Sequence, residues 1–233
     1  MSRGSWSKQP DPADEFALPG SRSAGDSRHP VRPGRHGLRA DAVAADQCER
    51  IIDAFAHVVA ERGYPQTTIK QITDAAGVSK KTFYVHFTDL EDCFLAAYEY
   101  SISSLLSRVR PAYQAESHWR DAIRAGLGAL LEWLAVEPAF ARMSVIETGS
   151  GGPRIRQARS RTVAEFEDVF AGHRTSSVPP TVRNAVSGGI YHTIYSYVAA
   201  DRTTELPELV ASLMYFALLP FIDKADAANE LSR

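Results

Sequence analysis

The side chains with the most evident chemistry gather in the segment 80–87, which the sequence predicts as a short helix. Two ammonium groups lie in its first turn, followed by a hydroxyl and a phenol, on Lys80, Lys81, Thr82 and Tyr84. Such groups donate hydrogen bonds to phosphate oxygens, and side chains in the first turn of a helix reach base edges when that helix enters a DNA major groove. The cluster therefore indicates a nucleic-acid-binding surface.

A shorter helix and a tight turn come just before this cluster and would position it. Thr68 and Gln71 have the spacing of a capping box, which predicts a helix beginning after Thr68. Its apolar positions recur at helical spacing, at Ile69, Ile72, Ala75 and Ala76. Gly77 can adopt a positive φ and end that helix, and Ser79 can cap the next one. Together these signals predict a helix-turn-helix.

The segment TTIKQITDAAGVSKKTFYVHF, preceded by ERGY, resembles the DNA-binding domain of TetR-family repressors. The family's pattern is TT, then A-A-G-V-S, then T-[LF]-Y-x-H-F, and nearly every part of it occurs here in order, within about residues 45–100. The resemblance implies that a set of polar residues faces DNA: Thr68, Lys70, Ser79, Lys80, Lys81, Thr82, Tyr84 and His86. The alternative is a solvated polar face on an ordinary helical hairpin.

Two positions near the end of the motif leave alternatives open. The family usually has a lysine four residues after His86, where it contacts the DNA backbone, and this chain has Leu90. The N-terminus of the next helix, capped by Thr88 or Asp89, is the alternative phosphate contact. His86 itself has a second interpretation, as a packed and hydrogen-bonded histidine between helices.

The bulk charge does not indicate a nucleic-acid-binding protein, since 233 residues carry a formal net charge of −2. A sequence-specific dimer needs only local positive charge, however. Residues 1–40 are rich in Ser, Pro, Gly and Arg, which predicts a disordered basic arm. Arg32 and Arg35 on such an arm are candidates for contacts in the adjacent minor groove, and the alternative is a solvated tail.

Cysteine usage and hydropathy both favour a soluble cytoplasmic protein. Cys48 and Cys93 are the two cysteines, and neither has the spacing of a metal site, so we expect buried thiols, no metal and no cofactor. The first thirty residues lack the apolar core of a signal peptide. The longest apolar run, 209–222, is interrupted and too short to span a membrane.

The rest of the chain shows helical periodicity without strand-like alternation, which predicts an all-α protein of about nine helices. We expect a DNA-binding domain over 41–88 and a larger helical effector-binding and dimerisation domain over 89–233. The expected helices are 41–62, 89–110 ended by Pro111, 117–135, 138–147, 154–170, 180–200 and 206–219, the last kinked or ended at Pro220. The helix that begins at Asp89 would connect the two domains.

The last two long helices are too apolar for surface helices. Gly188 and Gly189 would allow another helix to approach closely, and Leu213, Phe216 and Ala217 lie on the final helix. TetR-family members pair through such helices into a four-helix interface, so the resemblance implies a homodimer with two recognition helices. The alternative is a pair of helices buried inside one chain.

The resemblance also implies a small-molecule effector in the second domain. Aromatic and soft side chains on the helices expected to enclose a pocket are Trp119, Trp133, Phe140, Met143, Tyr191 and Tyr195. Polar candidates that could orient a ligand are Arg142, Glu147 and His192. Each has an alternative role in the core or on the surface, and cationic, aromatic and acyl ligands all fit this set.

These observations predict a homodimeric repressor that a small-molecule effector releases from a palindromic operator in double-stranded DNA. Two other classes stay open: a DNA-binding dimer that organises the chromosome without an effector, and a protein-interaction module. An enzyme is not predicted, because GSGGP at 149–153 lacks the lysine and hydroxyl of a phosphate-binding loop. Ser, His and Asp likewise show no catalytic spacing.

Overall fold

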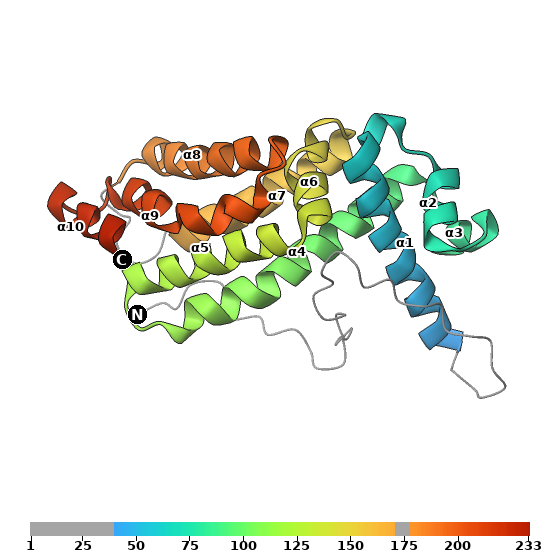
Figure 1. Ribbon diagram of the computed structural model, residues 1–233, viewed down its shortest axis with the longest axis horizontal. Helices are drawn as coiled ribbons and strands as arrows, with labels where there is room; N and C mark the ends of the chain where they lie inside the picture. The colour runs from blue at the N-terminus through green and yellow to red at the C-terminus, as the bar shows by residue number, and fades with distance from the viewer. Residues whose placement is uncertain (1–39, 171–177) are drawn as a thin grey trace.

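The computed structural model describes residues 40–170 and 178–233, and within these ranges the chain is helical without any strand (Figure 1). The all-α prediction is therefore confirmed. The α-helices are α1 (Ala40–Arg62), α2 (Ile69–Ala76), α3 (Lys80–His86), α4 (Leu90–Ala115), α5 (Trp119–Val136), α6 (Pro138–Val145), α7 (Pro153–Phe170), α8 (Pro180–Ala199), α9 (Val210–Leu218) and α10 (Lys224–Ala228). Short 3-10 helices are η2 (Tyr64–Gln66), η3 (Glu147–Gly149), η5 (Thr203–Leu209) and η6 (Asn229–Ser232).

Helices α1, α2 and α3 form a small unit at one end of the molecule (Figure 1). Its core is apolar and includes the fully buried Ile72 and Phe83. The rings of Phe55 and Phe94 meet edge to face with centroids 5.4 Å apart, so α4 also contributes to this core. Burial of these aromatic side chains stabilises this small unit.

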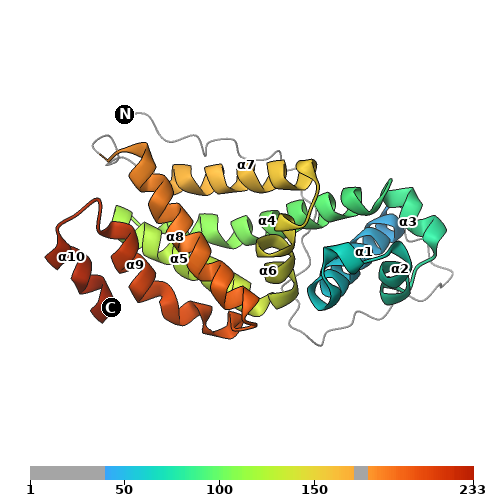
Figure 2. The same cartoon turned by 90° about the horizontal axis from the view of Figure 1, so that it is seen from above.

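Helix α4 runs from this unit into the rest of the protein and packs along α5 (Figures 1 and 2). Its predicted end at Pro111 is wrong, because the helix continues through that proline to Ala115. Pro111 removes one backbone donor, but it lies on the exposed side of α4. On the other side Val109 is buried and Tyr113 packs against Gly126 of α5, and this packing holds the last turn together.

The larger unit places α7 beside α4 and α8 beside α9, with α10 at the end farthest from α3 (Figure 2). The predicted final helix over 206–219 is only partly correct. Its first part is the 3-10 helix η5, which contains Pro207, and α9 ends at Leu218, before Pro220. The short α10 and η6 were not predicted.

The C-terminal segment is attached to α5 by ion pairs that join residues more than one hundred positions apart. The guanidinium of Arg124 donates to both the carboxylate and the backbone oxygen of Glu230, which is 2% exposed. Arg233 lies 2.8 Å from Asp121 and holds the pKa of that exposed carboxyl below its usual value. These long-range contacts fix the position of a segment whose own apolar content is small.

Candidate functional site

The helix-turn-helix has the local geometry that its sequence predicts. The backbone N–H of Thr68 donates to the Gln71 side chain at 2.8 Å, and the hydroxyl of Thr68 accepts from the Gln71 N–H, which completes the capping box. Gly77 ends α2 with φ of 64°, a left-handed conformation that favours glycine. The Ser79 hydroxyl then accepts from the Thr82 N–H at 3.0 Å and begins α3.

Helix α3 has one buried face and one exposed face. Phe83 and Phe87 are buried, and their ring centroids lie 5.5 Å apart. Lys80 and Lys81 are exposed on the other side, and Tyr84 is 58% exposed. A large aromatic side chain this exposed at the edge of the molecule is available for a partner. The structure thus presents the predicted lysines and tyrosine together on one open surface.

The remaining candidates for DNA contact lie around this surface and differ in their exposure and in their hydrogen-bond partners. Lys70 is exposed and pairs with Asp74 at 2.6 Å, an exposed ion pair that solvent weakens. The hydroxyls of Ser79 and Thr82 lie 2.9 Å apart and form a hydrogen bond with each other. His86 is half-buried, with Nε2 3.5 Å from the Gln47 side-chain oxygen.

The start of α4 carries carboxylates where the family usually has a lysine. Asp89 caps the helix by accepting from the Asp92 N–H at 2.8 Å, and the Asp92 side chain accepts from Thr88. Leu90 is half-buried against the core. These carboxylates occupy the N-terminus that was the alternative phosphate site. Arg32 and Arg35 lie outside the described residues.

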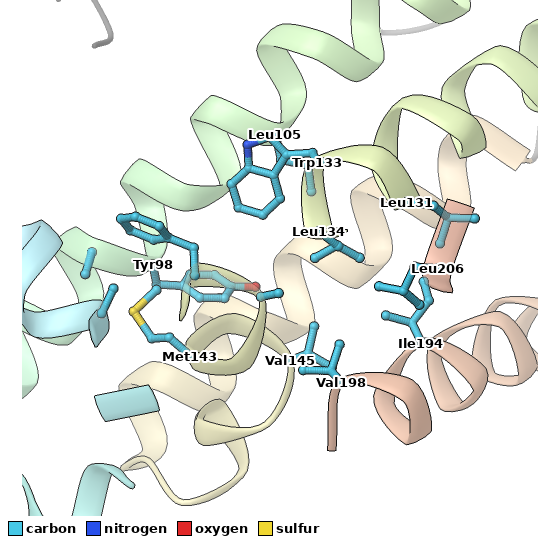
Figure 3. Close-up of a cluster of buried hydrophobic side chains, with 14 of the residues drawn as sticks. Tyr98, Leu105, Leu131, Trp133, Leu134, Met143, Val145, Ile194, Val198 and Leu206 are labelled. Atoms are coloured by element: carbon cyan, nitrogen blue, oxygen red, sulfur yellow. The ribbon is translucent and has the colours of Figure 1, made fainter. Parts of the chain in front are cut away.

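A cavity of about 160 Å³ lies inside the larger unit, between α4, α5, α6, α7 and α8. Of the predicted ligand residues, Trp133 and Tyr191 line it. Figure 3 shows Tyr98, Leu105, Trp133, Leu134 and Val145 converging from three helices. The complete lining is Tyr98, Ile102, Leu105, Val109, Tyr113, Ile123, Gly126, Leu127, Leu130, Trp133, Leu134, Ser144, Val145, Arg159, Thr162, Val163, Phe166, Ser187, Ile190, Tyr191 and Ile194.

Polar groups in the cavity wall mostly have partners within the protein. The Trp133 Nε1 donates to Ser104 at 3.2 Å, and the Tyr191 hydroxyl donates to the Val145 backbone oxygen at 2.7 Å. Burial raises the pKa of Tyr98 and of Tyr191, so both phenols stay neutral near pH 7. The cavity therefore presents an apolar interior with few open polar groups.

The other predicted ligand residues do not line this cavity. Trp119 packs edge to face on Phe221 with ring centroids 5.8 Å apart, and Phe140 packs at a tilt on Tyr100 with centroids 5.7 Å apart. Three more have other partners or face solvent: Met143 is fully buried in the core, and His192 and Tyr195 are exposed. Arg142 pairs with Asp201 at 3.2 Å.

Glu147 joins the two units instead. It is 6% exposed, and its Oε2 accepts from the backbone N–H of Tyr64 at 2.8 Å. Tyr64 begins η2, between α1 and α2, while Glu147 follows α6, whose Ser144 and Val145 line the cavity. No local pattern in the sequence could have indicated this contact, because it spans 83 positions.

The exposed faces of α8 and α9 contain no Asp, Glu, Lys or Arg. On α8 the exposed residues after its first turn are Asn184, Ala185, Gly188, His192, Tyr195, Ser196 and Ala199; on α9 they are Ser212 and Phe216, with Leu219 just after its end. Phe216 is 40% exposed and its ring lies against Gly189 of the same chain, while Gly188 faces open space. Leu213 and Ala217 are buried within the chain.

Two further features are absent from the part of the chain that the structure describes. No group of His, Cys, Asp and Glu there has the arrangement of a metal site. None of its helices is long and apolar enough to cross a membrane.

Comparison with known proteins agrees with this geometry. The family model described as "Bacterial regulatory proteins, tetR family" matches residues 51–97, which include α2 and α3. The fatty acid metabolism regulator protein of Bacillus subtilis is 21% identical over 175 residues, which cover 71% of this chain and 90% of that protein. The HTH-type transcriptional activator FasR of Mycolicibacterium smegmatis is 29% identical over 104 residues, 44% of this chain and 48% of that relative.

Solved structures show the same fold. The regulator FadR from Bacillus subtilis in complex with stearoyl-CoA superposes with a TM-score of 0.65 at 21% identity, covering 74% of this chain and 97% of that one. The fatty acid degradation regulator FadR from Bacillus halodurans gives 0.64 at 19% identity, over 74% of this chain and 94% of that one. With the family motif intact on an exposed α3, residues 51–97 form a DNA-binding domain of the TetR type, and the chain resembles DNA-binding transcriptional regulators in sequence and fold.

Proposed function

We propose that the chain acts as a homodimer that represses transcription from a palindromic operator and leaves the DNA when an acyl ligand fills the cavity. The observation that carries the DNA-binding part is the exposed surface of α3. Lys80, Lys81 and Tyr84 stand together there on a helix anchored by the buried Phe83. A rigid anchor with exposed donors is what a recognition helix needs to enter a major groove.

The uncharged faces of α8 and α9 support the dimer. Surface helices of a monomer normally expose charged residues, whereas these two expose glycine, alanine, serine and aromatic side chains. Gly188 has open space around its Cα, so a helix of a second copy can approach closely there. Pairing about a two-fold axis would present two α3 helices to two half-sites, which requires a palindromic operator.

The lining of the cavity and the likeness to fatty-acid regulators support an acyl effector. Nearly all of the wall is apolar, with leucine, isoleucine and valine from α4, α5 and α8. The Bacillus subtilis structure that shares this fold was solved with stearoyl-CoA, and the curated relative is named for fatty acid metabolism. An apolar chain gains free energy by displacing water from such a wall.

The experiment that tests this function is binding of the full chain to the DNA that flanks its own gene, titrated across salt concentration. We expect tight, sequence-selective binding by a dimer, with affinity that falls steeply as salt rises, and release on addition of an acyl ligand. Weak and unselective binding to this DNA would contradict the proposed operator. Selective binding that no acyl ligand changes would contradict the effector part alone.

The direction of regulation needs a separate measurement, because one relative, FasR, is named an activator. Transcription in vitro from the bound promoter distinguishes repression from activation. We expect the protein to lower the transcript yield and the ligand to restore it. A yield that rises with the protein would make the chain an activator with the same site.

A further inference from the structure

Arg159 is a cationic residue in the wall of the cavity, and it forms no ion pair with any carboxylate that the structure describes. Its guanidinium lies over the ring of Tyr191, 4.6 Å from the centroid, and the side chain is half-buried. Other arginines of this unit do pair with carboxylates: Arg124 with Glu230, Arg142 with Asp201 and Arg154 with Glu91. A guanidinium against a ring face keeps its N–H donors for a further partner.

Several other polar groups of the wall already have partners within the protein. The Tyr191 hydroxyl donates to the Val145 oxygen, the Ser144 hydroxyl lies 2.8 Å from that of Ser101, and the Thr162 hydroxyl donates to the Ala158 backbone oxygen at 3.3 Å. Arg159 is the cationic group of the wall, and its N–H donors are available to a ligand. Because a guanidinium binds carboxylates and phosphates in bidentate geometry, an anionic oxygen is the matching ligand group.

The volume of the cavity sets the size of the apolar part of the ligand. A dry protein cavity of about 150 Å³ holds a molecule the size of benzene, so about 160 Å³ accommodates about six to eight carbon atoms. Tyr113 and Gly126 are in contact within the wall, because a Cβ added at Gly126 would lie 3.5 Å from the Tyr113 ring. A sixteen-carbon chain would need a larger space.

We infer that the cavity binds a short amphiphile, with an apolar tail of about six to eight carbons and an anionic group held by Arg159. This inference rests on the proposed acyl effector and adds the chemistry of its head and the length of its tail. The anionic oxygen can come from the carboxylate of a free fatty acid or from a phosphate of an acyl thioester. Arg159 is a specificity-determining residue for either source.

The test is calorimetric titration of the full chain with four probes: octanoate, octanoyl-CoA, 1-octanol and palmitate. Arg159→Gln should weaken the eight-carbon anions about tenfold to a hundredfold, because it removes charge-assisted hydrogen bonds, and should leave 1-octanol unchanged. Arg159→Lys should retain part of the affinity. Arg161→Gln, which removes the same charge from an exposed position of the same helix, is the matched control and should change nothing.

Each of the other outcomes contradicts one part of the inference about the cavity ligand. If Arg161→Gln weakened octanoate binding as much as Arg159→Gln does, Arg159 would have no specific role in the site. Binding of octanoate by the unaltered protein would in that case still support an acyl effector. Palmitate bound in place of octanoate would overturn the tail length. No heat with any probe would overturn both the inference and the acyl effector, whereas operator binding is measured separately. Thermal melting of each variant confirms that it is folded.

Discussion

At the scale of single residues, α3 separates exposed side chains, which we propose contact DNA, from buried side chains that anchor the helix. Phe83 is buried and Tyr84, its neighbour, is 58% exposed, with the two rings edge to face and centroids 5.6 Å apart. The same seven-residue helix therefore contains both an anchor and a contact surface. Substitutions on the two faces should have separable effects on stability and on DNA affinity.

Lys81→Ala should weaken operator binding about tenfold, since a charged hydrogen bond to phosphate is lost. It should also lower the slope of log affinity against log salt by about one. Tyr84→Ala should weaken binding to the operator more than to unrelated DNA. Both effects are measured by fluorescence anisotropy, with Lys224→Ala, an exposed lysine on α10, as the control. Unchanged affinity in both α3 variants would remove α3 from the interface.

The thiols of Cys48 and Cys93 should react slowly in the folded protein. Burial raises the pKa of the Cys93 thiol well above its usual value, and the nearby Cys48 and Asp92 raise it further. Burial also raises the pKa of the Cys48 thiol. A raised pKa means a smaller thiolate fraction at pH 7 to 8, and the thiolate is the reactive form. Both should react slowly with a disulfide reagent in the folded protein and rapidly in guanidinium. Fast reaction of either thiol in the folded state would contradict this burial.

At the scale of elements, local signals predicted the helices well and long-range packing decided the rest. The capping box at Thr68 and the turn at Gly77 have their causes within four residues, so the sequence alone was sufficient for them. The sequence predicts that the helix ends at Pro111, whereas packing of α4 on α5 carries it past that residue. The cavity lining was only partly predicted, because which face of a helix turns inward depends on neighbours far away in the chain.

The link between Glu147 and Tyr64 is the element-scale feature with the clearest consequence for stability. Glu147→Ala leaves a backbone N–H without its acceptor, which should cost about 1–3 kcal/mol. The melting temperature of a chain this size should fall by about 2–4 °C per kcal/mol. Glu147→Gln keeps an acceptor oxygen and should lose less. Glu208→Ala, at an exposed glutamate of η5, is the control in calorimetry. An equal fall in its melting temperature would contradict a stabilising role for the hydrogen bond between Glu147 and Tyr64.

At the scale of the whole molecule, the position of the uncharged α8 and α9 surface would decide, in the proposed dimer, how two α3 helices meet DNA. That surface lies in the larger unit, and α3 lies at the other end, with α4 between them (Figure 1). The 26 residues of α4 span about 39 Å at 1.5 Å per residue. Pairing through α8 and α9 would therefore leave the recognition helices free to address separate half-sites.

Gly188→Arg should convert the dimer to a monomer without unfolding it, because a side chain at Gly188 meets open space within the chain. Loss of the second recognition helix should then lower operator affinity on the order of 100-fold. Sedimentation velocity measures the first effect and anisotropy the second. Gln157→Arg adds the same charge to an exposed position of α7 and should leave a dimer. A Gly188→Arg dimer would place the interface elsewhere.

The Glu147 contact has a consequence for the genetics of this regulator. Its acceptor is a side chain, but its donor is a backbone N–H, which every residue except proline would supply at position 64. Mutations that cut the link can therefore arise by almost any change at Glu147, yet at Tyr64 only by a change to proline. A screen for destabilised variants of the protein should recover many alleles at codon 147. Alleles at codon 64 should instead reflect the packing of its ring on Phe94.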